Sequence, residues 1–199
     1  VHSAFCLSPQ TVSTGVIGPG QVGRAFLSQL ASVLPRLRAG SQIDLRLRAI
    51  ANSRQMVLDH FEIDAAGAIE RLQDQTTQPL DLDGFAAQVP ADPIPHALTV
   101  DCSGNDAIAA QYPQWLAAGI HVVTPSKHAG SGDWSRYVAL REAQRGSGAR
   151  FGYEATVGAG LPVILTLRSL LDTGDDLHGI DGMLSGTLAW LFNSFDGSR

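Results

Sequence analysis

The sequence predicts an α/β fold in which helices cover both faces of a parallel sheet, followed by the start of a second, α+β domain. Three observations support this prediction. Short apolar segments alternate with stretches of helical periodicity between residues 12 and 153, a pattern typical of parallel strands joined by crossover helices. A glycine-rich segment directly follows the first apolar segment. After residue 153 the composition shifts to glycine and other small residues, which predicts a domain boundary.

The first part of the sheet domain is expected to contain, in order, a strand over 12–17, a helix over 21–34, a strand over 43–51, a helix over 56–72 and a short helix over 82–88. The strands are apolar or alternating runs, whereas the helices repeat apolar residues every three or four positions. The first helix should end before Pro35, because proline disfavours a helical residue in front of it.

The second part is expected to contain a strand over 97–102, a helix over 106–118, a strand over 120–124, a helix over 133–145 and a strand over 150–154. Beyond the boundary we expect a helix over 161–171, a strand over 179–184 and a helix over 187–195. The chain therefore divides into a linker from a preceding region (1–11), the sheet domain (12–153) and an incomplete second domain (154–199).

Composition and charge exclude several classes of function. The 199 residues include 44% hydrophobic and 17% charged residues, and the net charge is −5. With no basic run, the chain has no footprint for nucleic acid or an anionic membrane, so we expect a small-molecule ligand. The longest apolar stretches, such as 160–167, are too short to span a membrane, and no signal peptide is visible. Cys6 and Cys102 have no partner spacing, so a cytoplasmic location is expected.

The glycine-rich segment has the spacing Gly18-x-Gly20-x-x-Gly23 and stands between a predicted strand and a predicted helix. In a Rossmann-like sheet, the first glycine permits a tight turn, the second lets the backbone approach a pyrophosphate, and the third lets the helix pack closely. Taken alone, the spacing would also suit a structural turn. Its position between strand and helix favours a dinucleotide site.

The second strand ends in the run Ala51-Asn52-Ser53-Arg54, which contains no carboxylate. An NAD enzyme usually places an acidic residue here for the ribose 2′-hydroxyl. The Arg54 guanidinium could instead receive a 2′-phosphate through paired, charge-assisted hydrogen bonds. The run therefore favours NADP over NAD, with a solvated surface arginine as the alternative interpretation.

Two later loops also follow strands. Ser103 and Gly104 stand where a loop should approach the nicotinamide end of a dinucleotide, while Asn105 or Asp106 could cap the next helix. Lys127, after the following strand, could stabilise negative charge on a substrate or transfer a proton. Histidine is a common general acid or base, but the side chain of His128 beside it could point elsewhere.

The junction at 153–162 is irregular and rich in glycine. Main-chain carbonyls released from regular structure can coordinate a hard cation. From the residues alone, a hinge between domains is the simpler interpretation.

Six segments, in their order and spacing, resemble homoserine dehydrogenases over residues 12–195: GPGQVG, ANSR, DCSGND, HVVTPSKHA, YEATVGAGLPVI and GMLSGTLAWLFNSF. The first eight residues, VHSAFCLS, further resemble the junction that follows the regulatory region in fused aspartokinase/homoserine dehydrogenase enzymes. The family interconverts L-homoserine and L-aspartate 4-semialdehyde with NAD(P), on the route to threonine and methionine. The resemblance implies that the intact protein is a homo-oligomer.

The resemblance also implies roles for individual residues. The cofactor-binding set is Ile17, Gly18, Gly20, Gln21, Val22, Gly23, Ala51, Arg54, Ser103, Gly104 and Lys127, and Lys127 is also implied to be catalytic. The carbonyls of Glu154, Val157, Ala159 and Leu161 are implied to hold a sodium ion. Residues 154–199 are implied to begin the catalytic and dimerisation domain.

The family's substrate-binding acidic residues and its second essential lysine are expected downstream of the last segment, whereas the sequence ends at Arg199. We therefore expect the chain to be a fragment that binds cofactor weakly and catalyses poorly or not at all. A nucleotide-binding or regulatory module without turnover is the alternative from a different class of function.

Overall fold

The structure is a computed structural model that describes residues 10–41, 43–74, 77–183 and 185–197. Most of the expected linker and Cys6 lie outside the described residues. The chain divides into two compact units after Gly152.

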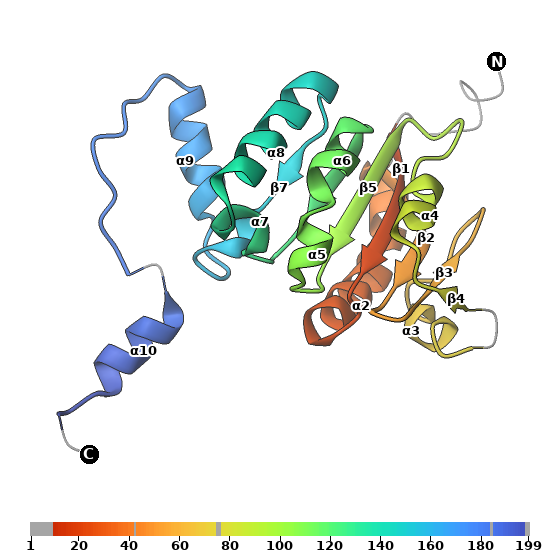
Figure 1. The fold of residues 1–199 in the computed structure, drawn as a ribbon, viewed down its shortest axis with the longest axis horizontal. Helices are drawn as coiled ribbons and strands as arrows, with labels where there is room; N and C mark the ends of the chain where they lie inside the picture. The colour runs from red at the N-terminus through yellow and green to blue at the C-terminus, as the bar shows by residue number, and fades with distance from the viewer. Residues whose placement is uncertain (1–9, 42, 75–76, 184, 198–199) are drawn as a thin grey trace. The chain divides into compact units, whose positions relative to one another are not determined.

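The first unit contains one seven-stranded sheet with the strand order β4-β3-β2-β1-β5-β6-β7 (Figure 1). The strands are β1 (Gln10–Ile17), β2 (Ile43–Ala51), β3 (Gln55–Leu58), β4 (Gln78–Pro79), β5 (His96–Asp101), β6 (Ile120–Val123) and β7 (Phe151–Gly152). The run from β2 to β7 is parallel, and β3 is antiparallel to both of its neighbours. The sheet is therefore mixed with a parallel core, which confirms the predicted fold class and adds an antiparallel edge.

The helices of the first unit are α2 (Gln21–Arg36), α3 (Ala68–Arg71), α4 (Leu82–Gln88), α5 (Asp106–Ala109), α6 (Tyr112–Ala117), α7 (His128–Ser131) and α8 (Trp134–Ser147). Neighbouring residues of β1 face opposite layers. Val16 belongs to the core cluster that contains Leu27 and Leu30 of α2. Gly15 lies so close to Phe85 of α4 that an added Cβ would be 2.6 Å from that ring. Helices therefore cover both faces of the sheet.

The predicted helix over 56–72 is wrong for most of its length. The side chain of Asn52 accepts hydrogen bonds from the backbone N–H groups of Arg54 (2.8 Å) and Gln55 (2.9 Å). This tight turn folds the next residues back along β2, where Met56 pairs with Ala51. Strand pairing with β2 therefore overrides the helical periodicity.

At two proline residues the observed helix boundaries differ from the predicted ones. Helix α2 continues through Pro35 and is followed by a wider π-helical turn over Leu37–Ser41, because a proline in the last turn removes only one backbone hydrogen bond. The predicted helix over 106–118 is divided into α5 and α6, with Pro113 in the first turn of α6. Proline lacks the N–H that a continuous helix would need there.

The second unit contains a short 3-10 turn (Glu154–Thr156), α9 (Val163–Asp172) and α10 (Gly186–Ser194). The expected strand over 179–184 does not form in residues 179–183, and Leu184 lies outside the described residues. All strands of the described chain belong to the sheet of the first unit. Residues 179–183 therefore have no partner with which to form strand hydrogen bonds.

Candidate functional site

Main-chain hydrogen bonds hold the loop between β1 and α2. The N–H of Gly18 donates to the carbonyl of Ala51 at the end of β2 (2.9 Å). The carbonyl of Ile17 accepts from the N–H of Cys102 just beyond β5 (2.8 Å). The loop is thus fixed to both neighbouring strands at the carboxyl edge of the sheet, where α/β proteins bind ligands.

The three glycines of this loop differ in what surrounds them. Gly18 has a φ of 81°, and a Cβ built on it would lie 2.4 Å from the Cα of Ser103. A Cβ on Gly23 would lie 2.3 Å from the carbonyl oxygen of Gly18. A Cβ on Gly20 would meet nothing within 4 Å. The fold therefore requires glycine at 18 and 23, whereas at 20 the missing side chain leaves the backbone open to a ligand.

A cavity of about 400 Å³ lies beside the loop. Its lining includes Gly18, Gly20 and Arg24 from the loop and α2, and Asn52 and Ser53 from the turn after β2. The volume falls within the range of about 300–1,000 Å³ that is usual for small-ligand sites. Among the described residues that line the cavity, none is acidic and Arg24 is the one cation. The site therefore suits an anionic ligand.

Arg54 is exposed and is not among the residues that line this cavity. Its N–H donates to the Asn52 side chain, and its carbonyl accepts from the N–H of Leu80 (2.9 Å). These contacts fix the backbone of Arg54 beside the cavity and leave its guanidinium in solvent.

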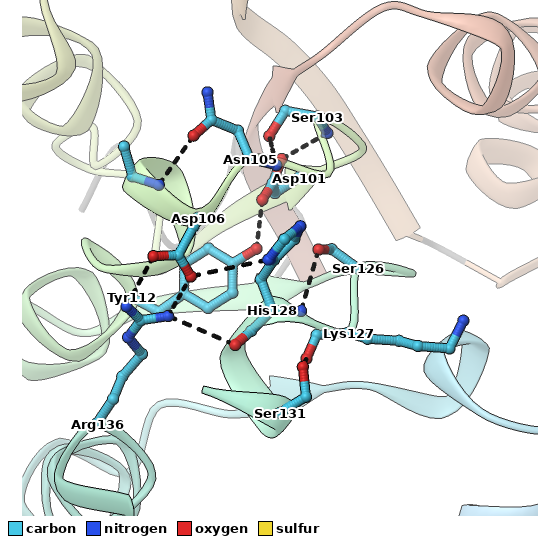
Figure 2. Close-up of polar contacts among 11 residues, drawn as sticks. Asp101, Ser103, Asn105, Asp106, Tyr112, Ser126, Lys127, His128, Ser131 and Arg136 are labelled. Carbon is cyan, nitrogen blue, oxygen red and sulfur yellow. Dashed lines mark hydrogen bonds and ion pairs between the residues drawn. The ribbon is translucent and has the colours of Figure 1, made fainter. Parts of the chain in front are cut away.

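The loop after β5 is anchored by the buried Asp101 (Figure 2). Its carboxylate accepts hydrogen bonds from the N–H of Ser103 (2.7 Å) and from the hydroxyl of Tyr112. Burial, together with the Asp101 charge, raises the pKa of Tyr112, so this hydroxyl remains a donor. The hydroxyl of Thr124 donates to the Asp101 carbonyl (2.8 Å). The network fixes the position of Ser103, which lines the cavity.

Two other residues of the same loop, Cys102 and Gly104, do not contribute reactive groups to the cavity. Gly104 has a φ of 59° but does not line the cavity. Burial and the charge of Asp101 raise the pKa of Cys102 to about 11. Because a thiol nucleophile acts as the thiolate, Cys102 is not suited to acyl-enzyme chemistry near neutral pH.

Lys127 lies at the start of α7, after β6. Its carbonyl accepts from the N–H (2.9 Å) and the hydroxyl (2.8 Å) of Ser131. Its exposed side chain extends away from the other labelled polar residues in Figure 2. The backbone of Lys127 is held by α7, while its ammonium is free to meet a ligand.

An ion pair connects α5 to α8 beside Lys127 (Figure 2). The Arg136 guanidinium donates to both carboxylate oxygens of Asp106, at 2.6 and 3.0 Å. These hydrogen bonds, and the charge of Arg136, lower the pKa of Asp106. Asn105 caps α5 by accepting from the N–H of Ala107 (2.8 Å), so of the two predicted capping residues Asn105 serves as the cap. The ring of His128 faces Asp106, with Nδ1 3.7 Å from its carboxylate.

In the second unit, the Glu154 carboxylate accepts from the N–H groups of Ile164 (3.1 Å) and Leu165 (2.7 Å) at the start of α9. Between these groups the backbone is irregular: Val157 is extended and Ala159 has a φ of 52°. The carbonyl of Leu161 accepts from the N–H of Val163 (2.9 Å). Several carbonyls of this segment thus lie outside helix or strand pairing.

The predicted cofactor residues occupy different positions. Those that line the cavity are Ile17, Gly18, Gly20 and Ser103. The other predicted residues do not line the cavity. Three of them, Gln21, Val22 and Gly23, form the first turn of α2, and Ala51 ends β2. The remaining three are Arg54, Gly104 and Lys127. Sequence reasoning missed Arg24 as a lining residue. Its spacing of four from Gly20 could have revealed it, because such residues share a helix face.

A membrane-spanning helix is not found: within the described ranges, no helix combines the length and the apolar character needed to cross a bilayer.

Comparisons with known proteins identify relatives of this chain. Residues 18–154 match the family described as homoserine dehydrogenase, NAD binding domain. The chain is 45% identical over 199 residues to bifunctional aspartokinase/homoserine dehydrogenase 1 of Zea mays, covering 100% of this chain and 22% of the relative. It is 31% identical over 198 residues to bifunctional aspartokinase/homoserine dehydrogenase 2 of Escherichia coli strain K12, covering 100% and 24%. The chain thus spans less than a quarter of these curated relatives.

Two solved structures share its fold. A Candida auris protein of unknown function matches with a TM-score of 0.79 and 32% identity, over 92% of this chain and 50% of that chain. A hyperthermophilic archaeal homoserine dehydrogenase, solved in complex with NADPH, matches with a TM-score of 0.66 and 24% identity, over 81% and 50%. At the latter identity the likeness concerns the fold alone.

Proposed function

The chain belongs to the homoserine dehydrogenase family, and from this membership we propose that its first unit binds NADP for the interconversion of L-homoserine and L-aspartate 4-semialdehyde. We further propose that it is the dehydrogenase part of an aspartokinase fusion, as in the relatives from Zea mays and Escherichia coli.

The observation that carries the proposal is the open backbone at Gly20 beside a cavity with no acidic residue in its described lining. Phosphate groups bind well at a helix N-terminus, where unpaired N–H groups and the helix dipole favour negative charge. Gly20 is the N-cap of α2 and has no side-chain cap. A dinucleotide pyrophosphate fits this place, with Ser103, whose Cα lies close to Gly18, toward the nicotinamide.

NADP, when bound, supplies the hydride acceptor for the oxidation of homoserine at its C4 carbon. The residues of this chain orient the reactants and stabilise the developing charge. The Lys127 ammonium carries three donors and a positive charge, so it would stabilise the alkoxide that develops at the C4 oxygen. The alcohol proton would pass to the family's second essential lysine, which the resemblance places downstream of the last matching segment. NADP is proposed over NAD because Arg54 stands where an NAD enzyme usually has a carboxylate. NAD is the alternative cofactor.

We also propose a sodium site formed by the carbonyls of Glu154, Val157, Ala159 and Leu161. The irregular backbone supports this site, since a non-glycine residue in the left-handed region implies a specific local constraint. Because the Glu154 carboxylate is bound to the start of α9, Glu154 would contribute through its carbonyl. Sodium NMR line broadening on the chain, with potassium as competitor, tests the site without requiring activity.

The activity is tested on a chain of the relatives' length. We expect homoserine-dependent NADP reduction by such a chain and its loss in Lys127→Ala, with folding unchanged. Activity without any dependence on Lys127 would remove this residue from the site. NADPH binding without turnover in the long chain would favour the regulatory module instead.

We also propose that the intact protein is a homo-oligomer and that it is located in the cytoplasm. Trp190, Phe192 and Phe195 are large exposed apolar side chains of the second unit, and such side chains are candidates for burial at a protein interface. Light scattering on the long chain tests the oligomer, and cell fractionation tests the location.

A further inference from the structure

Arg24 has a position that the proposed cofactor residues do not explain. It stands on α2 four residues after Gly20, and its N–H donates to the Gly20 carbonyl (2.8 Å). Its exposed side chain lines the cavity of about 400 Å³. A charged side chain thus lies one helical turn beyond the backbone that is open to a ligand.

The charge of Arg24 is not neutralised within the part of the chain that the structure describes. Some arginines of the first unit have carboxylate partners: Arg38 pairs with Asp44 and Glu62, and Arg136 with Asp106. Arg24 has no such ion pair among the described residues, and unlike the also unpaired Arg36 it lines the cavity, whose described lining holds no acidic residue. The cavity wall at Arg24 is therefore positively charged, in a chain with a net charge of −5.

We infer that Arg24 binds a phosphate group of the dinucleotide. A guanidinium presents paired donors that match the oxygens of a phosphate, and the N-terminus of α2 reinforces the same charge preference. The neutral Asn52 and Ser53 in the same lining leave room for an anion where an NAD site would hold a carboxylate. The inference rests on the proposed function, since it assigns a new residue to the same site.

The phosphate could be the pyrophosphate, which NADPH and NADH share, or the 2′-phosphate, which NADPH alone carries. The test compares Arg24→Gln with Arg36→Gln in the 199-residue chain. Arg36 lies in the last turn of the same helix and is also exposed, so both variants remove the same charge. Affinities for NADPH and NADH are measured by isothermal titration calorimetry at two salt concentrations, with circular dichroism to confirm folding.

We expect Arg24→Gln to weaken NADPH binding at least tenfold and to reduce its salt dependence, while Arg36→Gln binds like the wild type. An equal loss for NADH assigns Arg24 to the pyrophosphate, and a loss confined to NADPH assigns it to the 2′-phosphate. If Arg24→Gln binds both nucleotides like Arg36→Gln, the inference is wrong although the proposed function stands. If neither the wild-type 199-residue chain nor a chain of the relatives' length binds either nucleotide, both are overturned.

Discussion

At the scale of single residues, glycine serves two separate purposes in the loop after β1. At Gly18 and Gly23 a Cβ would collide with backbone atoms, so the fold requires glycine at these positions. At Gly20 the space is open, so we expect this position to serve ligand binding. The two purposes can be separated by experiment.

Gly20→Ala should lower NADPH affinity at least tenfold, because the methyl group would occupy the space of the phosphate. Its effect on the free energy of unfolding should stay below about 1 kcal/mol, the usual range for a change at an N-cap. Gly23→Ala should instead destabilise the fold by about 1–3 kcal/mol, as overpacking does. Urea unfolding and calorimetric titration measure both quantities. Equal destabilisation by the two variants would contradict the distinction.

Arg54→Ala should weaken NADP binding by roughly tenfold or more, since a hydrogen bond to a charged group contributes about 1.5–3 kcal/mol. NAD binding should change little, because NAD lacks the extra phosphate. The ratio of the two affinities is the readout. If both fall equally, or neither falls, Arg54 does not bind the 2′-phosphate. A double variant with Arg24→Gln shows whether the two guanidinium groups act on one phosphate.

The residues of the site could be predicted from sequence where a motif fixes both position and chemistry. The glycine spacing predicted a tight turn at Gly18 and backbone open to a ligand at Gly20; Gly18 has a φ of 81°, and Gly20 lines the cavity. The spacing of four from Gly20 places Arg24 on the helix face near the loop, but the sequence does not show which side chains surround it. Its importance depends on the absence of a nearby carboxylate, which is a property of three-dimensional neighbours.

At the scale of elements, strand pairing determined the secondary structure of segments whose local sequence pattern was ambiguous. The strand over 43–51 was predicted with the bounds of β2, and the helix over 82–88 with those of α4. Both have consistent local signals: β2 alternates and then becomes apolar, and α4 begins after an Asp81 cap. The segment that becomes β3 was predicted as a helix, since its pairing with β2 depends on a turn that periodicity does not report.

His121 should make the pairing of β6 with β7 sensitive to acid. Its Nδ1 accepts a hydrogen bond from the N–H of Arg150 (2.8 Å), just before β7. Burial, and then the charges of His96 and Arg150, lowers the pKa of His121. Because the folded-state pKa lies below the unfolded value of 6.5, the unfolded chain binds more protons between the two values. Stability from this residue is therefore complete above pH 6.5 and is lost as the pH falls.

The measurement is the free energy of unfolding between pH 8 and pH 5 for the wild type, His121→Gln and His178→Gln. Glutamine retains an acceptor but does not titrate, so His121→Gln should flatten the dependence on pH. His178 is exposed in the second unit, so its variant should follow the wild type. Identical slopes for all three chains would exclude His121 as the sensitive group.

At the scale of the whole molecule, the buried core lies in one unit. The buried hydrophobic residues of the described chain run from Val16 to Phe151. Helices α9 and α10 have no buried residues among those that the structure describes. The predicted boundary near 153 thus falls where burial ends, although sequence could not show that the second part would lack a core.

A chain that ends at Gly152 should therefore unfold cooperatively, with a Tm within about 4 °C of the 199-residue chain, a shift that corresponds to roughly 1 kcal/mol. It should also bind NADPH with similar affinity. Calorimetry and titration test both expectations. A shortened chain without a cooperative transition would show that residues 153–199 contribute to the core.

The main-chain support of the glycine loop has a consequence for engineering. Its anchoring hydrogen bonds come from the backbone of Ile17, Ala51 and Cys102, so side chains around it can be exchanged without removing them. Val22, in the first turn of α2, is 54% exposed, and Arg24 and Arg54 are also exposed. If the proposed function holds, we expect that cofactor preference can be changed between NADP and NAD by substitutions at these surface positions, while the glycine turn and its backbone hydrogen bonds remain unchanged.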